Sequence, residues 1–377
     1  QTSPRFNPVV KYATIEFREK FAGSCKECVK KKCVYVVFKD NYSYVSSMEE
    51  PEYVYTCQSC FRCVQECTKG IFSRVINPEY RTLGDDYYKP DIIHRTWYQA
   101  HTGKIPVSGA GYRGPFVDKG FDSMWTDMSE IVRPTRDGIH GREYINTCIE
   151  LSRRVSRLRF KDDMSLDMAL PPILEIPLPL MIQRPSCGVL GDNVLVSSAM
   201  AAHELETMMF IKPEDYIQAL TPYTENLVPC ITAGTITEHT ERIKKSRMVE
   251  LADAPGIENE FDRVRGLSPD VIIAVGMPLN AQAADRAVTL TLADVDTLHF
   301  YADDHGNEID SDNPRFLKEM IREIHLNLVE KCIRKKVKLI FSGGIAMAEH
   351  MAKAIICGAD GITVDIPLLI ALECRVC

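Results

Sequence analysis

The sequence lacks an unbroken apolar run of the length that crosses a membrane. A spanning helix needs about 20 consecutive apolar residues. The most apolar stretch of this chain, residues 166–182, contains Pro171, Pro172, Pro177 and Pro179. Proline breaks a helix because it removes a backbone hydrogen-bond donor. We therefore expect no membrane span.

Signals for export, nucleic-acid binding and dinucleotide binding are also missing. Residues 1–8 form neither the basic region nor the apolar core of a secretory leader. Basic residues are dispersed and the formal net charge is -7, so no basic footprint for nucleic acid exists. Residues 109–114 match G-x-G-x-x-G, but no apolar strand precedes them and Pro115 follows, so the required context is absent. We expect a cytoplasmic protein without a nucleic-acid partner.

Cysteine, by contrast, is abundant, with 14 in a chain of 377 residues. The downstream run, Cys57, Cys60, Cys63 and Cys67, has the Cys-x2-Cys-x2-Cys-x3-Cys spacing that wraps a chain around a cubane iron-sulfur cluster. Thr68 follows it where bacterial ferredoxins usually have proline. Buried thiols or disulfides are the alternative, but adjacent Cys-x2-Cys pairs leave little room for a core between them. The run predicts an electron-carrying protein.

An upstream run of cysteines adds to this pattern; it comprises Cys25, Cys28 and Cys33. A fourth cysteine would fall at Val37. In two-cluster ferredoxins the fourth cysteine of each run serves the other cluster, so Cys67 completes one 4Fe-4S site with the upstream run. The second site then holds a 4Fe-4S cluster with a distant ligand, holds a 3Fe-4S cluster, or is empty. Zinc is the rival metal, although its sites use two separated pairs.

The remaining chain divides by pattern. We expect an N-terminal tail (1–19), a ferredoxin-like iron-sulfur module (20–75), an irregular wrapping segment with one helix at 141–159 (76–165), and a β/α barrel (166–377). The expected barrel strands are 178–183, 247–251, 271–275, 297–301, 338–341 and 361–364, with helices at 314–334 and 346–357. A (β/α)8 barrel of the TIM type fits this order better than an open sheet.

The most informative barrel segment is the strand that ends in Ser342-Gly343-Gly344, before a helix and Gly358-Ala359-Asp360. Backbone amides at such turns can cradle a phosphate after barrel strands seven and eight. Tight turns that need glycine are the simpler alternative. Four single cysteines in apolar surroundings receive no assigned chemistry: Cys148, Cys230, Cys332 and Cys357. His299 and His305, with Asp303 and Asp304, suggest either an acid-base group or ordinary polar strand ends.

At this point the chain resembles the FMN-binding glutamate synthase large-subunit family, in the archaeal and anaerobe form with an N-terminal iron-sulfur module. The matching segments are residues 131–140 (IVRPTRDGIH), Ser186-Cys187-Gly188 where the family has Ser-Phe-Gly, Ser342-Gly343-Gly344 with Gly358-Ala359-Asp360, and residues 368–374 (LLIALEC). The resemblance covers roughly the whole chain. It implies FMN, held by the serines, Cys187, the glycines, Ala359 and Asp360 of these segments.

The resemblance also implies an activity and partners. In the family, FMN takes electrons from an iron-sulfur centre and reduces the imine of 2-oxoglutarate and ammonia to glutamate. A further cluster is implied by Cys374 and Cys377. The chain lacks the N-terminal cysteine of a glutaminase, so a separate glutaminase subunit would supply ammonia. Other redox subunits are implied, with a ferredoxin or an NAD(P)H-oxidising flavoprotein as electron donor.

Three loops depart from the family pattern. Thr207-Met-Met-Phe-Ile211 replaces Thr-Gly-Glu-Gly-Gly, and residues 252–256 put Ala254 where the family has a lysine. Residues 301–306 (YADDHG) replace a glycine-rich segment. Two hypotheses therefore stand. The favoured one is a glutamate synthase-type flavoenzyme that binds FMN, and the alternative is a non-catalytic electron-transfer or scaffold subunit with a degenerate barrel site. No catalytic residue is assigned under either.

Overall fold

The computed structural model describes residues 13–17, 61–65, 72–103, 120–124, 147–155, 157–168, 170–186 and 190–376. The chain forms two compact units, one of Gln1–Pro106 with Glu373–Cys377 and one of Val107–Leu372. No helix in the described ranges combines the length and the apolar character needed to cross a bilayer.

The described elements of the first unit are β1 Ala13–Phe17, α3 Arg62–Gln65, β2 Phe72–Ile76, α4 Pro78–Arg81 and α5 Pro90–Thr102. Strands β1 and β2 pair antiparallel, with Ala13 opposite Ile76. Helix α5 lies within the segment that we expected to hold a single helix at 141–159, so that expectation was wrong. Proline at its first position and the buried Ile92, Ile93 and Trp97 favour it.

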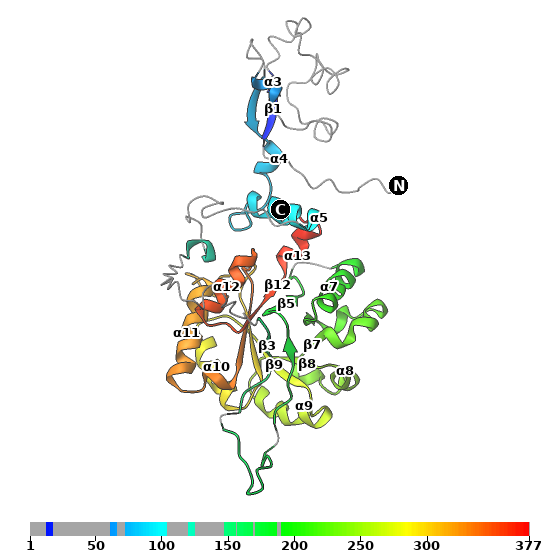
Figure 1. Ribbon diagram of the computed structural model, residues 1–377, viewed down its shortest axis with the longest axis vertical. Coiled ribbons are helices and arrows are strands. Elements are labelled where there is room, and N and C mark those ends of the chain that lie inside the picture. The colour runs from blue at the N-terminus through cyan, green and yellow to red at the C-terminus, as the bar shows by residue number, and fades with distance from the viewer. Residues whose placement is uncertain are drawn as a thin grey trace, which may run out of the picture. The chain divides into compact units, whose positions relative to one another are not determined.

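The second unit contains a closed barrel of parallel strands, which confirms the expected β/α barrel (Figure 1). Its strands are β5 Leu180–Gln183, β6 Met209–Ile211, β7 Leu227–Ile231, β8 Met248–Ala252, β9 Ile272–Pro278, β10 Thr297–Tyr301, β11 Lys338–Ser342 and β12 Gly361–Val364. They follow one another around the barrel, and β12 pairs with β5 to close it. All strands therefore end at the same rim, where barrel enzymes place their functional groups.

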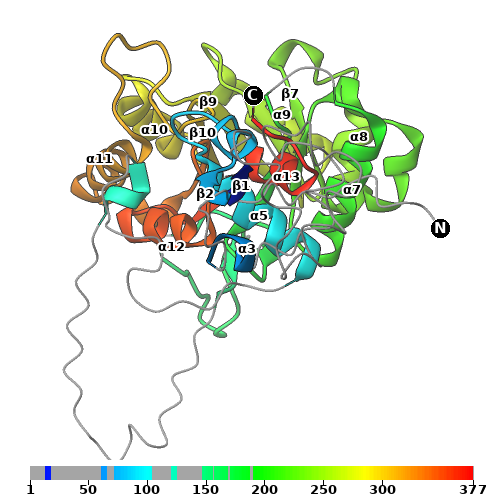
Figure 2. The same cartoon turned by 90° about the horizontal axis from the view of Figure 1, so that it is seen from above.

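Helices surround the barrel (Figure 2). They are α7 Asp192–Glu204, α8 Thr240–Lys245, α9 Phe261–Leu267, α10 Ala283–Leu292, α11 Leu317–Glu330, α12 Ala348–Cys357 and α13 Ile366–Ala371. Short 3-10 turns are η2 Gly120–Ser123, η3 Pro213–Asp215, η4 Gln218–Asn226, η5 Ala233–Thr235, η6 Ile257–Glu260 and η7 Arg334–Lys336. The strands bury both faces, which is why they read as continuous apolar runs.

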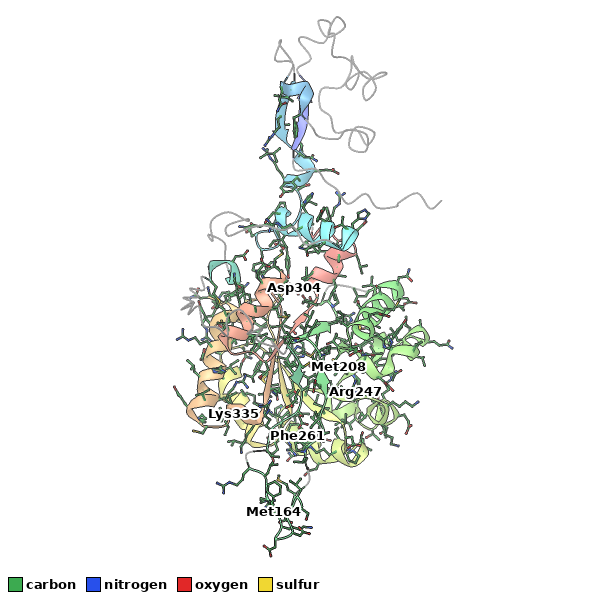
Figure 3. The ribbon with its side chains drawn as sticks, viewed as in Figure 1. Met164, Met208, Arg247, Phe261, Asp304 and Lys335 are labelled. Atoms are coloured by element: carbon green, nitrogen blue, oxygen red, sulfur yellow. The ribbon has the colours of Figure 1, made fainter. Side chains whose placement is uncertain are left out.

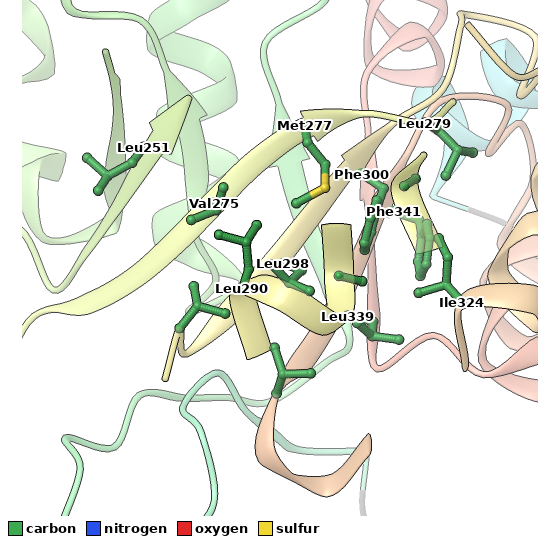
Figure 4. Close-up of a cluster of buried hydrophobic side chains, with 14 of the residues drawn as sticks. Leu251, Val275, Met277, Leu279, Leu290, Leu298, Phe300, Ile324, Leu339 and Phe341 are labelled. Carbon is green, nitrogen blue, oxygen red and sulfur yellow. The ribbon is translucent and has the colours of Figure 1, made fainter. Parts of the chain in front are cut away.

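The outward faces of the strands form one large apolar core with the helices (Figure 4). The rings of Phe300 on β10 and Phe341 on β11 stack in it, with centroids 5.0 Å apart. Leu290 of α10 and Ile324 of α11 are buried in the same cluster. Because successive strand side chains point to opposite faces, the alternate residues are left to fill the barrel interior.

Two barrel strands were not expected from the sequence, β6 and β7. We interpreted residues 207–211 as a substituted loop, but Met209–Ile211 is strand β6, so that interpretation was wrong. Each parallel strand runs toward the carboxyl rim, so only Ile211, the last residue of β6, lies at that rim. Strand β7 contains Pro229, which removes a backbone donor and weakens a strand signal.

The amino end of the barrel is closed by a short ladder of β3 Ile149–Glu150 and β4 Glu175–Ile176. The fully buried Leu151 packs here in the apolar interior, and Thr297 donates a 2.8 Å hydrogen bond to its carbonyl. The helix expected at 141–159 is therefore wrong over its described residues. The backbone is extended there because this conformation packs Ile149 and Leu151 against the barrel interior. Residues 141–146 lie outside the described ranges.

A hairpin at residues 157–168 lies between the two strands of this ladder in the chain. Phe160 and Leu166 pair across it, and Met164 at its tip is 76% exposed (Figure 3). A backbone hydrogen bond of 2.8 Å from Lys161 to Ser165 closes the turn.

Candidate functional site

The barrel interior has two chemically different layers. The layer toward the amino end is apolar and includes Met181, Met208, Val228, Met248, Ile272 and Ile340. The layer toward the carboxyl rim carries polar side chains that we call the barrel network: Cys230, Glu250, His299, Tyr301, Ser342 and Thr363. These six come from β7, β8, β10, β11 and β12.

Glu250 is the centre of the network. His299 Nδ1 lies 2.6 Å from Glu250 Oε2, and the Tyr301 hydroxyl donates to Oε1. His299 is fully buried and Glu250 is 3% exposed. A buried carboxylate is tolerated when it is hydrogen bonded in this way.

The network continues from the other imidazole nitrogen. His299 Nε2 is hydrogen bonded to Ser342 Oγ, which lies 2.5 Å from Thr363 Oγ1. One proton arrangement satisfies every bond: His299 carries its proton on Nδ1 and donates it to Glu250, while Nε2 accepts from Ser342. Thr363 then donates to Ser342. The result is a directed chain of donors that ends at a carboxylate.

Burial and the nearby carboxylate raise the pKa of two members of the network. Burial raises the pKa of Tyr301 well above its ordinary value, and Glu250 raises it further. The pKa of the Cys230 thiol is raised by the same two causes. We assigned no chemistry to Cys230 from the sequence. A single cysteine in an apolar strand gives no sign of a carboxylate on the neighbouring strand.

Gly276 on β9 provides the space for this arrangement. A Cβ atom there would lie 2.7 Å from Glu250 Cδ and 2.9 Å from Tyr301 Cε2. No side chain fits at this position without moving the network. The sequence shows this glycine only as an interruption of an apolar strand.

The turn after β11 contains Gly343 and Gly344 with φ values of 93° and 65°. A Cβ on Gly343 would meet the Asp303 carbonyl at 2.3 Å, and one on Gly344 would meet Gly306 Cα at 2.5 Å. The glycines are therefore required by close packing against the loop that follows β10.

Asp365 follows strand β12 as the N-cap of α13 and is 6% exposed. Its carboxylate accepts a 2.6 Å hydrogen bond from Ile366 N at the start of α13. Burial, with a contribution from Asp304, raises the pKa of Asp365 to about 6. Asp304 in turn accepts a 2.7 Å hydrogen bond from Ser186 Oγ. Two carboxylates therefore lie at this part of the rim.

The predicted cofactor residues fall at opposite ends of the barrel. Ser186 and Ser342-Gly343-Gly344 follow β5 and end β11, so they lie at the carboxyl rim. Gly358, Ala359 and Asp360 precede β12 and lie at the amino end. There Asp360 Oδ2 accepts 2.8 Å hydrogen bonds from Arg334 and from Leu339 N. Cys187 and Gly188 lie outside the described residues.

Most predicted metal ligands also lie outside the described residues: Cys25, Cys28, Cys33, Cys57, Cys60, Cys67 and Cys377. Cys63 belongs to α3. Cys374 belongs to the first unit, where Val376 N donates a 3.5 Å hydrogen bond to its sulfur. Within the described ranges, no three His, Cys, Asp or Glu side chains are grouped to hold a metal. The iron-sulfur sites stay a prediction.

Comparison with known proteins relates the chain to glutamate synthases. Residues 317–377 match the conserved region in glutamate synthase. An archaeal-type glutamate synthase (NADPH) of Dehalococcoides mccartyi is 22% identical, over 85% of this chain and 73% of its own length. Archaeal glutamate synthases (NADPH) of Methanocaldococcus jannaschii and Archaeoglobus fulgidus are 23% and 22% identical over 85% of this chain, and over 80% and 73% of their own lengths. The chain is thus a distant relative of the archaeal-type glutamate synthases and carries the conserved glutamate synthase region near its C-terminus.

Proposed function

We propose that this chain is an iron-sulfur electron-transfer protein of the glutamate synthase line whose barrel works without FMN. The cysteine spacing supports the clusters, because the two runs supply a complete set of thiolate ligands for at least one of them. The observation that carries the second part is the pair of carboxylates, Asp304 and Asp365, at the carboxyl rim.

Whether the barrel rim can hold FMN depends first on whether it can hold the phosphate of FMN. Barrels bind such a phosphate with backbone N–H groups after strands seven and eight and at the start of a short helix. Here the carboxylate of Asp365 already takes the Ile366 N–H at the start of α13. A phosphate monoester is close to doubly charged at pH 7, so it would meet Asp365 and Asp304 as like charges.

Among the described residues, two arginines near this rim already have carboxylate partners, and Lys212, which follows β6, is exposed. Arg184 is paired with Asp215, and Arg286 holds Asp253 at 2.7 Å. Gly343 and Gly344 pack against the loop after β10. Ala254 supplies no charge where the related family has lysine. Among the described residues of this rim, the two carboxylates are therefore what counts against FMN.

The test is a cofactor analysis of the whole chain purified under anaerobic conditions. Iron, acid-labile sulfide and acid-released flavin are quantified beside the visible spectrum. We expect iron-sulfur absorption that bleaches on reduction, and no stoichiometric FMN even after incubation with excess FMN. Stoichiometric FMN overturns the second part of the proposal, and a preparation that cannot be loaded with iron overturns the first.

A second candidate function is glutamate formation from 2-oxoglutarate and ammonia through FMN. The relationship to glutamate synthases favours it, as does the Ser342-Gly343-Gly344 turn at the end of β11. Under this candidate we propose a glutaminase partner as the source of ammonia. Retained FMN together with ammonia-dependent consumption of 2-oxoglutarate would establish it in place of the first.

Both candidates require redox partners. We propose a ferredoxin or an NAD(P)H-oxidising flavoprotein as the electron donor, within a complex of several redox subunits. Reduction of the clusters by each donor, followed by the bleaching of cluster absorption, separates the two donors. A glutaminase partner is required only by the second candidate.

A further inference from the structure

Three members of the barrel network have the order of a nucleophile, a base and an orienting acid. Ser342 Oγ is hydrogen bonded to His299 Nε2, and His299 Nδ1 lies 2.6 Å from Glu250 Oε2. This order of contacts is that of a serine-histidine-carboxylate triad, which recurs on unrelated folds and is recognised by geometry. Neighbouring barrel strands β10 and β11 and the more distant β8 supply the three groups.

The imidazole is held in place by its surroundings. The rings of Phe210 and Tyr301 contact His299, with centroids 4.4 Å and 4.3 Å away. Tyr301 also donates to the second oxygen of Glu250, which fixes the carboxylate. A catalytic base gains from such positioning, because little reorganisation is then needed during reaction.

Ser342 lies at the carboxyl rim of the barrel and is 3% exposed. It is the last residue of β11, and barrel enzymes carry their catalytic residues at the carboxyl ends of strands. The residue that follows it, Gly343, is buried, and its backbone N–H has no hydrogen-bond partner within the described part of the chain. In serine hydrolases the N–H after the nucleophile is one donor of the oxyanion hole.

We propose that Ser342 is the nucleophile of an acyl-transfer site, with His299 as its base and Glu250 as the group that orients the base. Ser342 Oγ attacks the carbonyl carbon of an ester or amide while its proton passes to His299 Nε2. The proton then goes to the leaving alcohol or amine as the carbonyl bond to that group breaks. Water hydrolyses the acyl-serine by the same proton route and restores the free serine.

The charge of the rim selects the class of acyl substrate. Asp365 follows the strand that carries Thr363, and Asp304 follows the strand that carries His299. Both carboxylates would repel an anionic acyl group. The site therefore takes an uncharged or cationic ester or amide.

The direct test is covalent labelling of the full chain with an uncharged fluorophosphonate probe, followed by peptide mass mapping. We expect the phosphonyl group on Ser342. Ser342→Ala abolishes labelling, and Glu250→Gln slows it at least tenfold because the base loses its orienting charge. Circular dichroism and thermal unfolding of each variant show that the barrel is folded. Ser198→Ala is the matched control, since this buried helix serine has no histidine partner in the described structure.

Folded wild-type protein that takes up no probe overturns the proposal, as does labelling that survives Ser342→Ala. The measurement needs neither iron nor flavin, so its failure leaves the electron-transfer proposal intact. Hydrolysis of p-nitrophenyl acetate provides a second readout. The rate of Ser342→Ala serves as the background and is subtracted. We expect the remaining hydrolysis rate to be lower in His299→Gln than in the wild type by on the order of a hundredfold or more.

Discussion

The two layers of the barrel interior are built on the same strands yet have opposite chemistry. Strand β8 places Met248 in the apolar layer and Glu250 in the network. Strand β11 does the same with Ile340 and Ser342. The difference lies only in distance along the strand, because both residues of each pair point inward.

This difference separates stability from function. The apolar layer is sealed by Leu151 and needs only close packing. The hydrogen bonds of the network have to offset the loss of water around a carboxylate and an imidazole. Proteins with apolar side chains of similar volume in place of such buried groups are often at least as stable. The polar groups in the half of the barrel toward the carboxyl rim are therefore better explained by a role in binding or catalysis than by stability.

The largest expected effect comes from removing the centre of the network. Glu250→Ala leaves His299, Tyr301 and Cys230 without their shared acceptor. We expect a loss of about 3–5 kcal/mol in the free energy of unfolding, because each unpaired buried donor costs about 1–3 kcal/mol. Urea unfolding followed by circular dichroism measures it. Met248→Leu, a volume-conserving change on the same strand, is the control and should stay within about 1.5 kcal/mol. A loss for Glu250→Ala no larger than that for Met248→Leu would contradict the central role of this carboxylate.

The sequence predicted the barrel because its long strands are continuous apolar runs. Strand β9, Ile272–Pro278, and strand β10, Thr297–Tyr301, were found within a few residues of their bounds. The three-residue β6 and the proline-containing β7 were missed, since neither gives a periodic signal. The ladder of β3 and β4 was missed because its extended form depends on contacts with the barrel.

The candidate site was only partly visible in the sequence. Ser342 was singled out for the glycines that follow it, and His299 for its residue type. Their contact could not be foreseen, because it joins strands that are 43 residues apart. Glu250 lies 49 residues from His299, inside an apolar strand with no motif around it. Hydrogen bonds across a barrel depend on register, which a single sequence does not specify.

The second prediction concerns the apolar layer. Leu151→Ala removes a fully buried side chain that seals the amino end, and we expect a loss of about 2–4 kcal/mol from lost transfer energy and a residual cavity. Fluorophosphonate labelling of Ser342, corrected for the folded fraction, should remain unchanged. A change in labelling of the folded protein would show that the two layers are coupled. It would contradict the separation of stability and function between them.

The third prediction compares two interior glycines. Gly276→Ala places a Cβ within 3 Å of Glu250 and Tyr301, and we expect a loss of about 1–3 kcal/mol because the network has to shift. Gly361→Ala is the matched control in β12. There a Cβ meets the flexible ends of Ile149 and Met181 at 3.1 Å, so we expect a loss below about 1 kcal/mol. Thermal unfolding of both variants gives the ranking, and equal losses would contradict it.

The smallest effect is a dependence on pH at the carboxyl rim. Burial raises the pKa of Asp365 from 3.8 to about 6, so the native state binds its proton more readily than the unfolded chain does. The contribution of Asp365 to stability is therefore greatest below pH 4, falls as the pH rises from about 4 to 6, and stays reduced above 6. The full shift corresponds to about 3 kcal/mol at most, and we expect about 1 kcal/mol because neighbouring groups relax.

Asp365→Asn tests this last effect, because the amide keeps an oxygen for the Ile366 N–H but cannot ionise. Its stability relative to the wild type should rise between pH 4 and 6 and then remain constant to pH 8. Unfolding in urea at a series of pH values measures the difference. Ser186→Ala is the control, since it removes a donor to Asp304 and leaves Asp365 able to titrate. A difference that does not vary with pH would mean that Asp365 is ionised throughout and that the rim tolerates negative charge. An anionic ligand would then meet no electrostatic barrier from Asp365 at this rim.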